Sequence, residues 1–286
     1  MKLSRRRFVR TSLLYVPWLV LKGDKVNCSS FLPIPSILDD TYQWAYGTVP
    51  GNSGSVSAQT VMRVNGFMQA VLPIRSKLSR LNLYVGNNLG AFMAPVIHDI
   101  GPSTESNPGF IEANCSESTG LTNDGTKWLN LGFNMSSLGT DNSTHLGIYV
   151  RTKTGVFGGS IGTYDGTNVD YYSYQFGTGY GNMHGAVNGV STVDGGVGHY
   201  VVSRIASNDL QLYKNGISIA SQASPGGTRV TVYPVIAHAY NGIGVITAKQ
   251  LGASAAYHAG TGLTSSDVTL LYNALQAFNT LYSRQV

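Results

Sequence analysis

The chain has 286 residues, of which 42% are hydrophobic and 12% charged, with 35 glycines and 17 tyrosines. This hydrophobic content excludes a wholly disordered chain, and the length is sufficient for one large all-β domain or two small ones. The formal net charge is +5, but seven basic residues and one acidic residue precede Cys28, which leaves 12 basic and 13 acidic residues after them. A body that begins near Cys28 therefore carries a net charge close to −1, which argues against nucleic-acid binding because that function needs a basic surface.

The basic residues of the first segment cluster in SRRRFVR, residues 4–10, directly before Thr11–Leu21, an apolar run of 11 residues. The run is too short to span a bilayer and matches the apolar region of a signal peptide. Residues 4–10 resemble a twin-arginine export signal. The resemblance implies that residues 1–27 form an export segment and that the protein works in the periplasm, at the cell surface or outside the cell. No small-x-small cleavage site follows Leu21, so retention as an N-terminal membrane anchor stays an alternative.

The region before the main β segment combines a linker with predicted helices. Residues 28–57 are rich in proline, glycine and serine, which predicts an extended linker. Apolar residues between Val61 and Leu72 recur at spacings of three and four, which predicts an amphipathic helix from Ser57 to Leu72. A strand over 78–85 and a short helix over 87–97 follow. We therefore expect residues 58–105 to form a helical lead-in region.

From about residue 110 onward, apolar residues alternate with polar ones, and clusters of Gly, Asn, Asp and Ser separate the runs. This pattern is typical of an antiparallel sandwich or barrel. The predicted strands are 127–134, 145–152, 169–176, 199–205, 229–240 and 245–257.

The segment DLQLYKNGISIAS, residues 209–221, predicts a hairpin because Asn215-Gly216 is the preferred pair for a type I′ turn. The expected register places Leu212 opposite Ile219 and puts both, together with Ile217, on one apolar face.

The chain closes with a predicted amphipathic helix from Ser265 to Tyr282. Thr264 and Asp267 have the spacing of a capping box, with Asp in place of Glu. An apolar stripe runs along the helix, and we expect it to cover one end or edge of the sandwich. The stripe consists of Val268, Leu271, Leu275, Phe278 and Leu281.

Three segments carry a resemblance to a known family: SAQTVMRVNGFMQAVLPIRSKLSRLNLYVGNNLGA, GTKWLNLGFN with HLGIYVRT, and YKNGISIAS with the C-terminal GTGLTSSDVTLLYNALQAFNTLYSRQV. They resemble bacterial and phage proteins with a laminin G-like, concanavalin A-like lectin/glucanase fold. The resemblance implies a mainly β fold, namely an antiparallel β-sandwich (jelly roll) over residues 106–286 that includes the C-terminal helix. It identifies the fold and leaves the activity open.

The enzymatic branch of this fold needs two carboxylates about 5 Å apart, which on a strand requires alternating acids. The chain has three glutamates, Glu105, Glu112 and Glu117, in one loop-like stretch without that alternation. The six histidines stand singly in the sequence, and a lone histidine is usually a packed or hydrogen-bonded side chain. The sequence therefore argues against a retaining glucanase, while a polysaccharide-degrading enzyme with an unrecognised active site remains an alternative.

The segment YDGTNVDYYSYQFGTGYGNMH, residues 164–184, offers the aromatic rings and polar groups that sugar binding needs. The competing interpretation is that one tyrosine face belongs to the sandwich core and that the DGTN segment is only a turn. Hard oxygen donors at close spacing in the same segment suit a calcium ion. The candidate ligand-binding residues are Tyr172, Tyr174, Tyr180, Asn182 and His184, and the candidate calcium ligands are Asp165, Asn168 and Asp170.

These patterns leave three functional hypotheses. The first is an exported, noncatalytic carbohydrate-binding or adhesion module whose partner is a polysaccharide or other glycan. The second is an extracellular structural protein that associates with copies of itself, and the third is the enzyme named above. Cys28 and Cys115 allow either one disulfide or two thiols.

Overall fold

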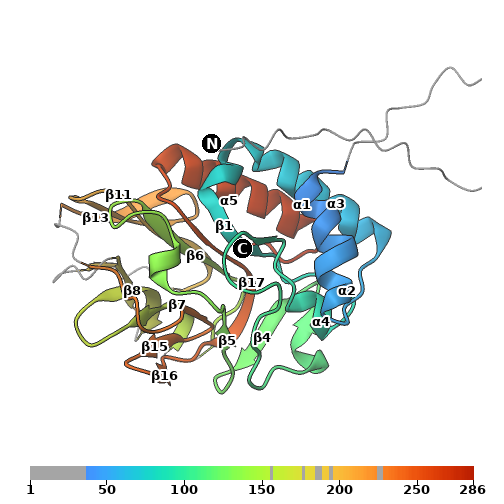
Figure 1. Cartoon of the computed structure of the whole chain (residues 1–286), viewed down its shortest axis with the longest axis horizontal. Coiled ribbons are helices and arrows are strands. Elements are labelled where there is room, and N and C mark those ends of the chain that lie inside the picture. Colours follow the sequence, from blue (N-terminus) through green and yellow to red (C-terminus); the bar gives the residue numbers. More distant parts are fainter. Residues whose placement is uncertain (1–36, 155–156, 176–177, 184–188, 193–195, 224–227) are drawn as a thin grey trace, which may run out of the picture. The chain divides into compact units, whose positions relative to one another are not determined.

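The computed structural model describes residues 37–154, 157–175, 178–183, 189–192, 196–223 and 228–286. Within them two β-sheets pack face to face, and helices cover the outer face of one sheet (Figure 1). The sandwich expected from the alternating pattern is confirmed. No helix in the described ranges combines the length and hydrophobicity that a bilayer crossing requires.

The first sheet has nine strands in the order β13-β12-β11-β6-β17-β1-β2, and β3 and β4 join it beside β17. Its long strand β17 is shared, since β4 pairs with the first half of β17 and β1 with the second half. The strands are β1 (Leu78–Asn82), β2 (Ile97–His98), β3 (Cys115–Ser116), β4 (Gly120–Asp124), β6 (Thr144–Val150), β11 (Gly198–Ala206), β12 (Asp209–Lys214), β13 (Ile217–Gln222) and β17 (Leu251–Gly260).

The second sheet has eight strands in the order β10-β9-β8-β7-β14-β5, with the β15–β16 hairpin attached to β7. All its pairings are antiparallel except that of β15 with β7. The strands are β5 (Leu129–Asn130), β7 (Phe157–Tyr164), β8 (Val169–Gln175), β9 (Thr178–Asn182), β10 (Val190–Thr192), β14 (Ile236–Ala237), β15 (Tyr240–Gly242) and β16 (Val245–Thr247).

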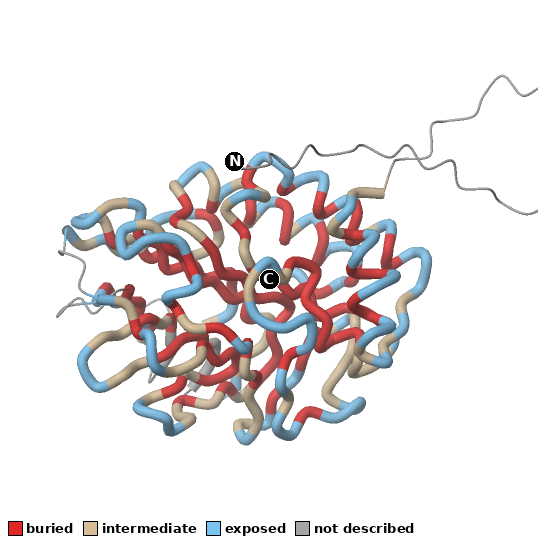
Figure 2. The backbone as a smooth tube through the Cα atoms, in the orientation of Figure 1, coloured by how far each residue is buried: buried red, intermediate tan, exposed pale blue. Residues whose placement is uncertain are grey.

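The space between the sheets is filled by alternate residues of the facing strands. Leu146, Ile148 and Val150 of β6 are fully or almost fully buried, as are Tyr172 of β8 and Ile161 of β7. Figure 2 shows buried positions along the central strands and exposed positions at the connecting loops. The period-two pattern of the sequence is thus the pattern of side chains that point into this layer.

The outer face of the first sheet is covered by helices from both ends of the described chain. The longest are α3 (Ala58–Ala70) and α5 (Ser265–Thr280), which contact each other through Phe67 and Phe278, with ring centroids 5.6 Å apart. The shorter helices are α1 (Asp39–Gln43), the π-helix η1 (Trp44–Thr48), α2 (Val49–Gly51), α4 (Leu89–Phe92) and the 3₁₀ turns η2 (Leu72–Lys77), η3 (Glu112–Asn114) and η4 (Met135–Ser137).

The C-terminal helix agrees with its prediction except in its placement. Thr264 and Asp267 form the expected capping box, and the stripe from Val268 to Phe278 is buried. Leu281 lies beyond the helix and is 53% exposed. The helix packs on the outer face of the first sheet, together with Val201 and Ala256, and not at one end of the sandwich.

Other predictions also needed correction. The expected strand 127–134 is reduced to Leu129–Asn130, and the expected strand 245–257 is divided into β16 and β17. Residues 39–51, expected within an extended linker, are helical because Trp44 and Val49 bury their side chains in the helix–sheet core. Only Ile236–Ala237 and Tyr240 of the expected strand 229–240 lie in strands. The 209–221 hairpin forms around Asn215-Gly216, but a bulge on β13 pairs Leu212 with Ala220 and not with Ile219. Ile217 pairs with Lys214 as expected, but it is 69% exposed and does not join an apolar face.

Candidate functional site

The described part of the stretch 164–184 forms β8 and β9 of the second sheet, between β7 and the edge strand β10, and its tyrosines divide between the two faces. Tyr172 is fully buried between the sheets and stacks on Tyr200, with ring centroids 4.5 Å apart. It is therefore a core residue, contrary to the prediction that it contacts ligand. Tyr174 lies in β8, where its backbone pairs with Gly158 and Gly179. His184 lies outside the described residues.

The neighbouring tyrosines lie on the outer face of the second sheet. Tyr171 packs ring to ring on Tyr240 of β15, with centroids 5.2 Å apart and planes 13° apart. Tyr180 of β9 is 39% exposed and pairs with Ser173, two residues along from Tyr171. Positions two apart share a face of a strand, so these residues form one surface. We call Tyr171, Tyr180 and Tyr240 the tyrosine platform.

Glycines make the platform sterically possible. A Cβ at Gly162 of β7 would lie 2.3 Å from Cβ of Tyr171, so only glycine at position 162 leaves room for Tyr171. On β9, a Cβ at Gly179 would face Oη of Tyr172 at 3.5 Å, which identifies Gly179 as core-facing and its neighbour Tyr180 as outward-facing. Asn182, the last strand residue, is 7% exposed and thus largely withdrawn from the platform.

Tyr171 of the platform is uncharged at neutral pH. Burial, together with smaller contributions from the nearby Tyr240 and Tyr180, raises the pKa of Tyr171 to about 12. The phenol therefore keeps its proton and remains a hydrogen-bond donor. Tyrosine rings with hydroxyl tips can stack on an apolar sugar face and bond its hydroxyls.

The three candidate calcium ligands do not converge. The carboxylate of Asp165 accepts hydrogen bonds from the backbone N–H groups of Thr167 (2.9 Å) and Asn168 (2.7 Å), and from the Asn168 side chain (3.1 Å). It forms the turn between β7 and β8. Asp170 is fully buried, and its Oδ2 accepts from the backbone N–H of Val230 at 2.8 Å. In the described ranges no group of three or more His, Cys, Asp or Glu side chains is arranged to hold a metal ion.

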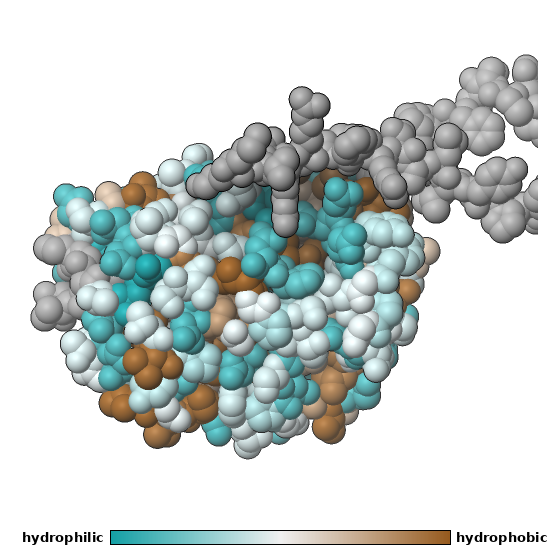
Figure 3. Space-filling view, in the orientation of Figure 1, coloured by the Kyte–Doolittle hydropathy of each residue, from teal (hydrophilic) through white to brown (hydrophobic). Residues whose placement is uncertain are grey.

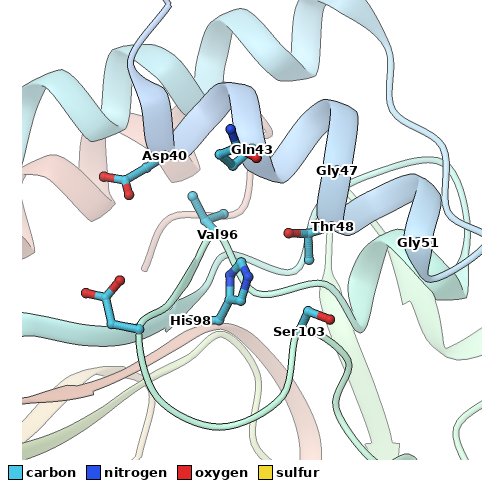
Figure 4. A pocket seen from close by; sticks show the side chains of 9 residues that line it. Asp40, Gln43, Gly47, Thr48, Gly51, Val96, His98 and Ser103 are labelled. Atoms are coloured by element: carbon cyan, nitrogen blue, oxygen red, sulfur yellow. The ribbon is translucent and has the colours of Figure 1, made fainter. Parts of the chain in front are cut away.

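A second candidate surface is a pocket of about 420 Å³ between the α1–η1–α2 segment and the chain after β2 (Figure 4). Its polar lining includes Gln43 and Thr48 from the helices, and His98 and Ser103 from the opposite wall. Burial lowers the pKa of His98, so its ring is neutral at pH 7. The volume suits one sugar-sized polar molecule.

Arg75 bridges Asp40 and Asp99, the two carboxylates in the lining of this pocket. Its guanidinium binds Asp40, at 2.6 Å and 2.9 Å, and Asp99, at 2.8 Å and 3.1 Å. These hydrogen bonds, that to Asp40 above all, raise the pKa of Arg75. Both carboxylates are thus paired with a permanent cation, which removes the proton-transfer role that a hydrolase would need from them. The sequence could not indicate this pocket, because half of it comes from the segment expected to be extended.

Glu105 is the carboxyl group with the most altered acidity in the described chain. Burial raises its pKa to about 7. It accepts hydrogen bonds from the Tyr257 hydroxyl and from Asn82 Nδ2 (3.2 Å), and the Arg80 guanidinium lies 3.8 Å away. Such a pKa would suit a general acid, but Glu105 is only 2% exposed. A polysaccharide cannot reach this carboxyl in the structure described.

Three histidines that stand singly in the sequence meet between the first sheet and α5. The backbone oxygen of Thr261 accepts from His145 Nδ1 (2.6 Å), His145 Nε2 lies 3.0 Å from His258 Nδ1, and His258 Nε2 lies 2.8 Å from His199 Nε2. All three are fully buried, and burial lowers their pKa values, to about 4 for His145 and about 3 for His199. We call this the histidine chain. The sequence signal was their shared strand face, which becomes visible only once β11, β6 and β17 are known to be neighbours.

Comparisons with known proteins bear on the fold. No protein-family model matches the chain, and no curated protein matches it in sequence. The binding domain of botulinum neurotoxin serotype D is similar in structure, with a TM-score of 0.50 and 11% identity over 71% of this chain and 52% of that one. This chain therefore spans about half the length of the neurotoxin domain. At such low identity, the likeness shows a shared sandwich fold.

Two weaker structural likenesses involve proteins solved with sugars. Domain 4 of AbnA, an extracellular arabinanase of Geobacillus stearothermophilus in complex with arabinotriose, has a TM-score of 0.42 and 14% identity, over 68% of this chain and 98% of that one. A leech intramolecular trans-sialidase complexed with 2,7-anhydro-Neu5Ac has a TM-score of 0.34 and 12% identity, over 46% of this chain and 23% of that one.

Proposed function

We propose that this protein is an exported, noncatalytic carbohydrate-binding or adhesion module that binds a glycan on the tyrosine platform. The observation that carries the proposal is the group of three tyrosines on the outer face of the second sheet, where Tyr171 and Tyr240 stack and Tyr180 stands exposed beside them. A rigid sheet holds the rings in place, so little conformational entropy is lost when a sugar stacks on them.

The chemistry of the platform favours a neutral glycan with exposed apolar ring faces. Tyrosine rings supply apolar contact, and their protonated hydroxyls supply hydrogen bonds at the edges. Nothing in the platform provides a positive charge to attract an acidic sugar.

The charged groups described above favour binding over hydrolysis. Asp40 and Asp99 are both held by Arg75, and Glu105 is closed off from solvent. Retaining hydrolysis needs two free carboxyl groups about 5 Å apart around the scissile bond, and neither group of acids meets that need.

The test is glycan-array and polysaccharide pull-down binding with the full chain, followed by titration of any ligand found. Replacing the exposed ring in Tyr180→Ala should weaken binding about tenfold, because loss of one stacking ring costs about 1–1.5 kcal/mol. Tyr46→Ala is the matched control, since Tyr46 is 60% exposed on η1, away from the platform.

The outcomes separate the candidate surfaces. Equal binding by wild type and Tyr180→Ala would refute the platform. Loss of binding in His98→Ala alone would assign the glycan to the pocket beside η1. Clean negatives across plant, algal and bacterial glycans would refute the proposed function itself.

A further inference from the structure

The hairpin β15–β16 ends in an exposed aliphatic tip. Ile243 is 54% exposed, Val245 66% and Val232 68%. Val232 belongs to this tip because its neighbour Tyr233 packs against the turn, where a Cβ at Gly244 would lie 3.3 Å from the Tyr233 ring. Figure 3 shows apolar surface gathered at the end of the molecule where Figure 1 labels β15 and β16. We call Val232, Ile243 and Val245 the aliphatic tip.

The backbone of the tip is strained at Ile243. Gly242 pairs with Val245, so the two residues between them form the turn, with φ of +54° at Ile243 and +80° at Gly244. These are the values of a type I′ turn, which favours Asn, Asp or Gly at the first position. The turn between β12 and β13 is of the same type and uses Asn215, with φ of +50°, before Gly216. A β-branched residue at positive φ is unusual, and such strain is found mainly where a function requires the side chain.

Packing does not explain the choice of isoleucine. More than half of the Ile243 side chain is in solvent, so the site gains little from burial. The backbone N–H of Ile243 donates to the backbone oxygen of Tyr164 at 2.8 Å. Any residue except proline would make this hydrogen bond. The structure therefore holds an aliphatic side chain outward at a conformational cost.

The surroundings of the tip resemble those of side chains that enter a lipid surface. Residues 230–248, VTVYPVIAHAYNGIGVITA, contain no Asp, Glu, Lys or Arg. The only histidine among them, His238, is fully buried, and burial lowers its pKa to about 3. Tyr164, Tyr233 and Tyr240 stand at the base of the tip, and tyrosine is enriched at the level of lipid headgroups. The carboxylate of Asp165, next in sequence to Tyr164, accepts hydrogen bonds from the backbone of the turn that follows β7.

We propose that the aliphatic tip inserts into the headgroup–acyl boundary of a lipid bilayer and holds the sandwich at a membrane surface. The exposed aliphatic residues, the absence of charged residues from 230–248 and the tyrosines at the base favour a bilayer over a groove in another protein, which would be rimmed by polar groups. Three aliphatic side chains bury less apolar area than one myristoyl chain, so binding by the tip alone is weak and reversible.

The first experiment places a fluorophore at the tip itself, so that lipid contact elsewhere in the full chain does not contribute to the signal. In a Cys28→Ser, Cys115→Ser background, Val245→Cys carries an environment-sensitive fluorophore and is mixed with phosphatidylcholine vesicles. The matched control is Ile217→Cys with the same fluorophore, because Ile217 is 69% exposed beside the type I′ turn between β12 and β13. We expect a several-fold fluorescence gain at position 245, quenched by spin-labelled phosphatidylcholine, and none at position 217.

A second variant separates loss of insertion from loss of folding. Ile243→Asn, added to the position-245 reporter, should reduce the lipid-dependent signal at least fivefold and should also raise the melting temperature by about 2–4 °C, because Asn tolerates positive φ. An unchanged signal in Ile243→Asn would overturn the proposal. The proposal would also be overturned if the fluorophore at position 245 gave no signal with pure lipid vesicles and responded only to membranes that carry proteins, with the signal lost after protease treatment.

Discussion

Arg284 fixes the C-terminal segment to the sandwich from within. Its side chain is fully buried and donates to the backbone oxygens of Leu83 (2.7 Å) and Tyr84 (2.9 Å). It also donates to Asn279 Oδ1 at 2.8 Å. Burial lowers its pKa to about 10, so the side chain is still charged at pH 7. A planar guanidinium can reach several carbonyl groups at once, which an ammonium group cannot.

Replacing Arg284 should therefore be among the most destabilising single changes in this chain. Arg284→Met leaves several buried carbonyl groups without a donor, and we expect a loss of about 4 kcal/mol in the free energy of unfolding. Urea unfolding at pH 7 measures it. Arg63→Met is the control, because the Arg63 guanidinium stacks on the Tyr282 ring at a partly exposed site, and it should cost less than about 1 kcal/mol. Similar losses in both variants would contradict this account.

At the scale of elements, the histidine chain has a fixed direction. A carbonyl oxygen only accepts, so His145 carries its proton on Nδ1, His258 on Nδ1 and His199 on Nε2 when all three rings are neutral. His199 Nδ1 is then an acceptor without a hydrogen-bond partner in the described chain. The first added proton can enter there without breaking a bond. The charged or titratable groups around the chain are Lys77, Asp267, Tyr149 and Tyr272.

This arrangement predicts instability in acid. Unfolded histidines take up protons near pH 6.5, whereas the folded rings stay neutral to about pH 4 or below, so falling pH favours the unfolded chain. Glu105 acts in the opposite direction, since its raised pKa lets the folded state bind a proton first. The net loss from pH 7 to pH 5 should be on the order of 5 kcal/mol.

Denaturant unfolding at the two pH values measures this loss. His199→Phe keeps an aromatic ring between Tyr149 and Tyr272 and should reduce the loss by about 2 kcal/mol. A stability that is flat between pH 7 and pH 5, or a pH dependence that His199→Phe leaves unchanged, would contradict the prediction.

The same scale shows what the sequence could and could not predict. Strands with regular alternation, such as β6, β8 and β11, and the capped helix α5 were predictable because burial dictates their periodicity. Tyr171 and Tyr172 show the limit: alternation separates them onto two faces but does not reveal which face is covered by another sheet. The bulge on β13 and the helices at 39–51 depend on tertiary packing, and the histidine chain depends on strand order. None of these has a local sequence signal.

At the scale of the whole molecule, the three layers keep the candidate surfaces apart. The pocket beside η1 belongs to the helical side of the first sheet, whereas the tyrosine platform and the aliphatic tip belong to the second sheet. The platform and the tip also share an element, since Tyr240 begins the hairpin that ends in Ile243. A glycan on the platform and a bilayer at the tip would therefore be held by the same sheet.

Export is the whole-molecule part of the proposed function. If residues 1–27 are removed on export, the intact mass of protein recovered from the extracytoplasmic fraction of its native host should correspond to a chain that begins near Cys28. Loss of that fraction when Arg5 and Arg6 are both changed to Lys would assign the route to the twin-arginine signal. Full-length mass in a membrane fraction would instead indicate a retained anchor, and full-length mass in the cytoplasm would refute export.

Because Ile243 is strained, a single substitution at this position can raise the thermal stability of the molecule. A laboratory selection that rewards survival at high temperature alone should replace Ile243 early, with Asn or Gly, because the turn geometry already suits them. A selection that rewards attachment to membranes should keep an aliphatic residue there. The residues recovered at this one position under the two regimes would show whether the hairpin was shaped by folding or by its surroundings.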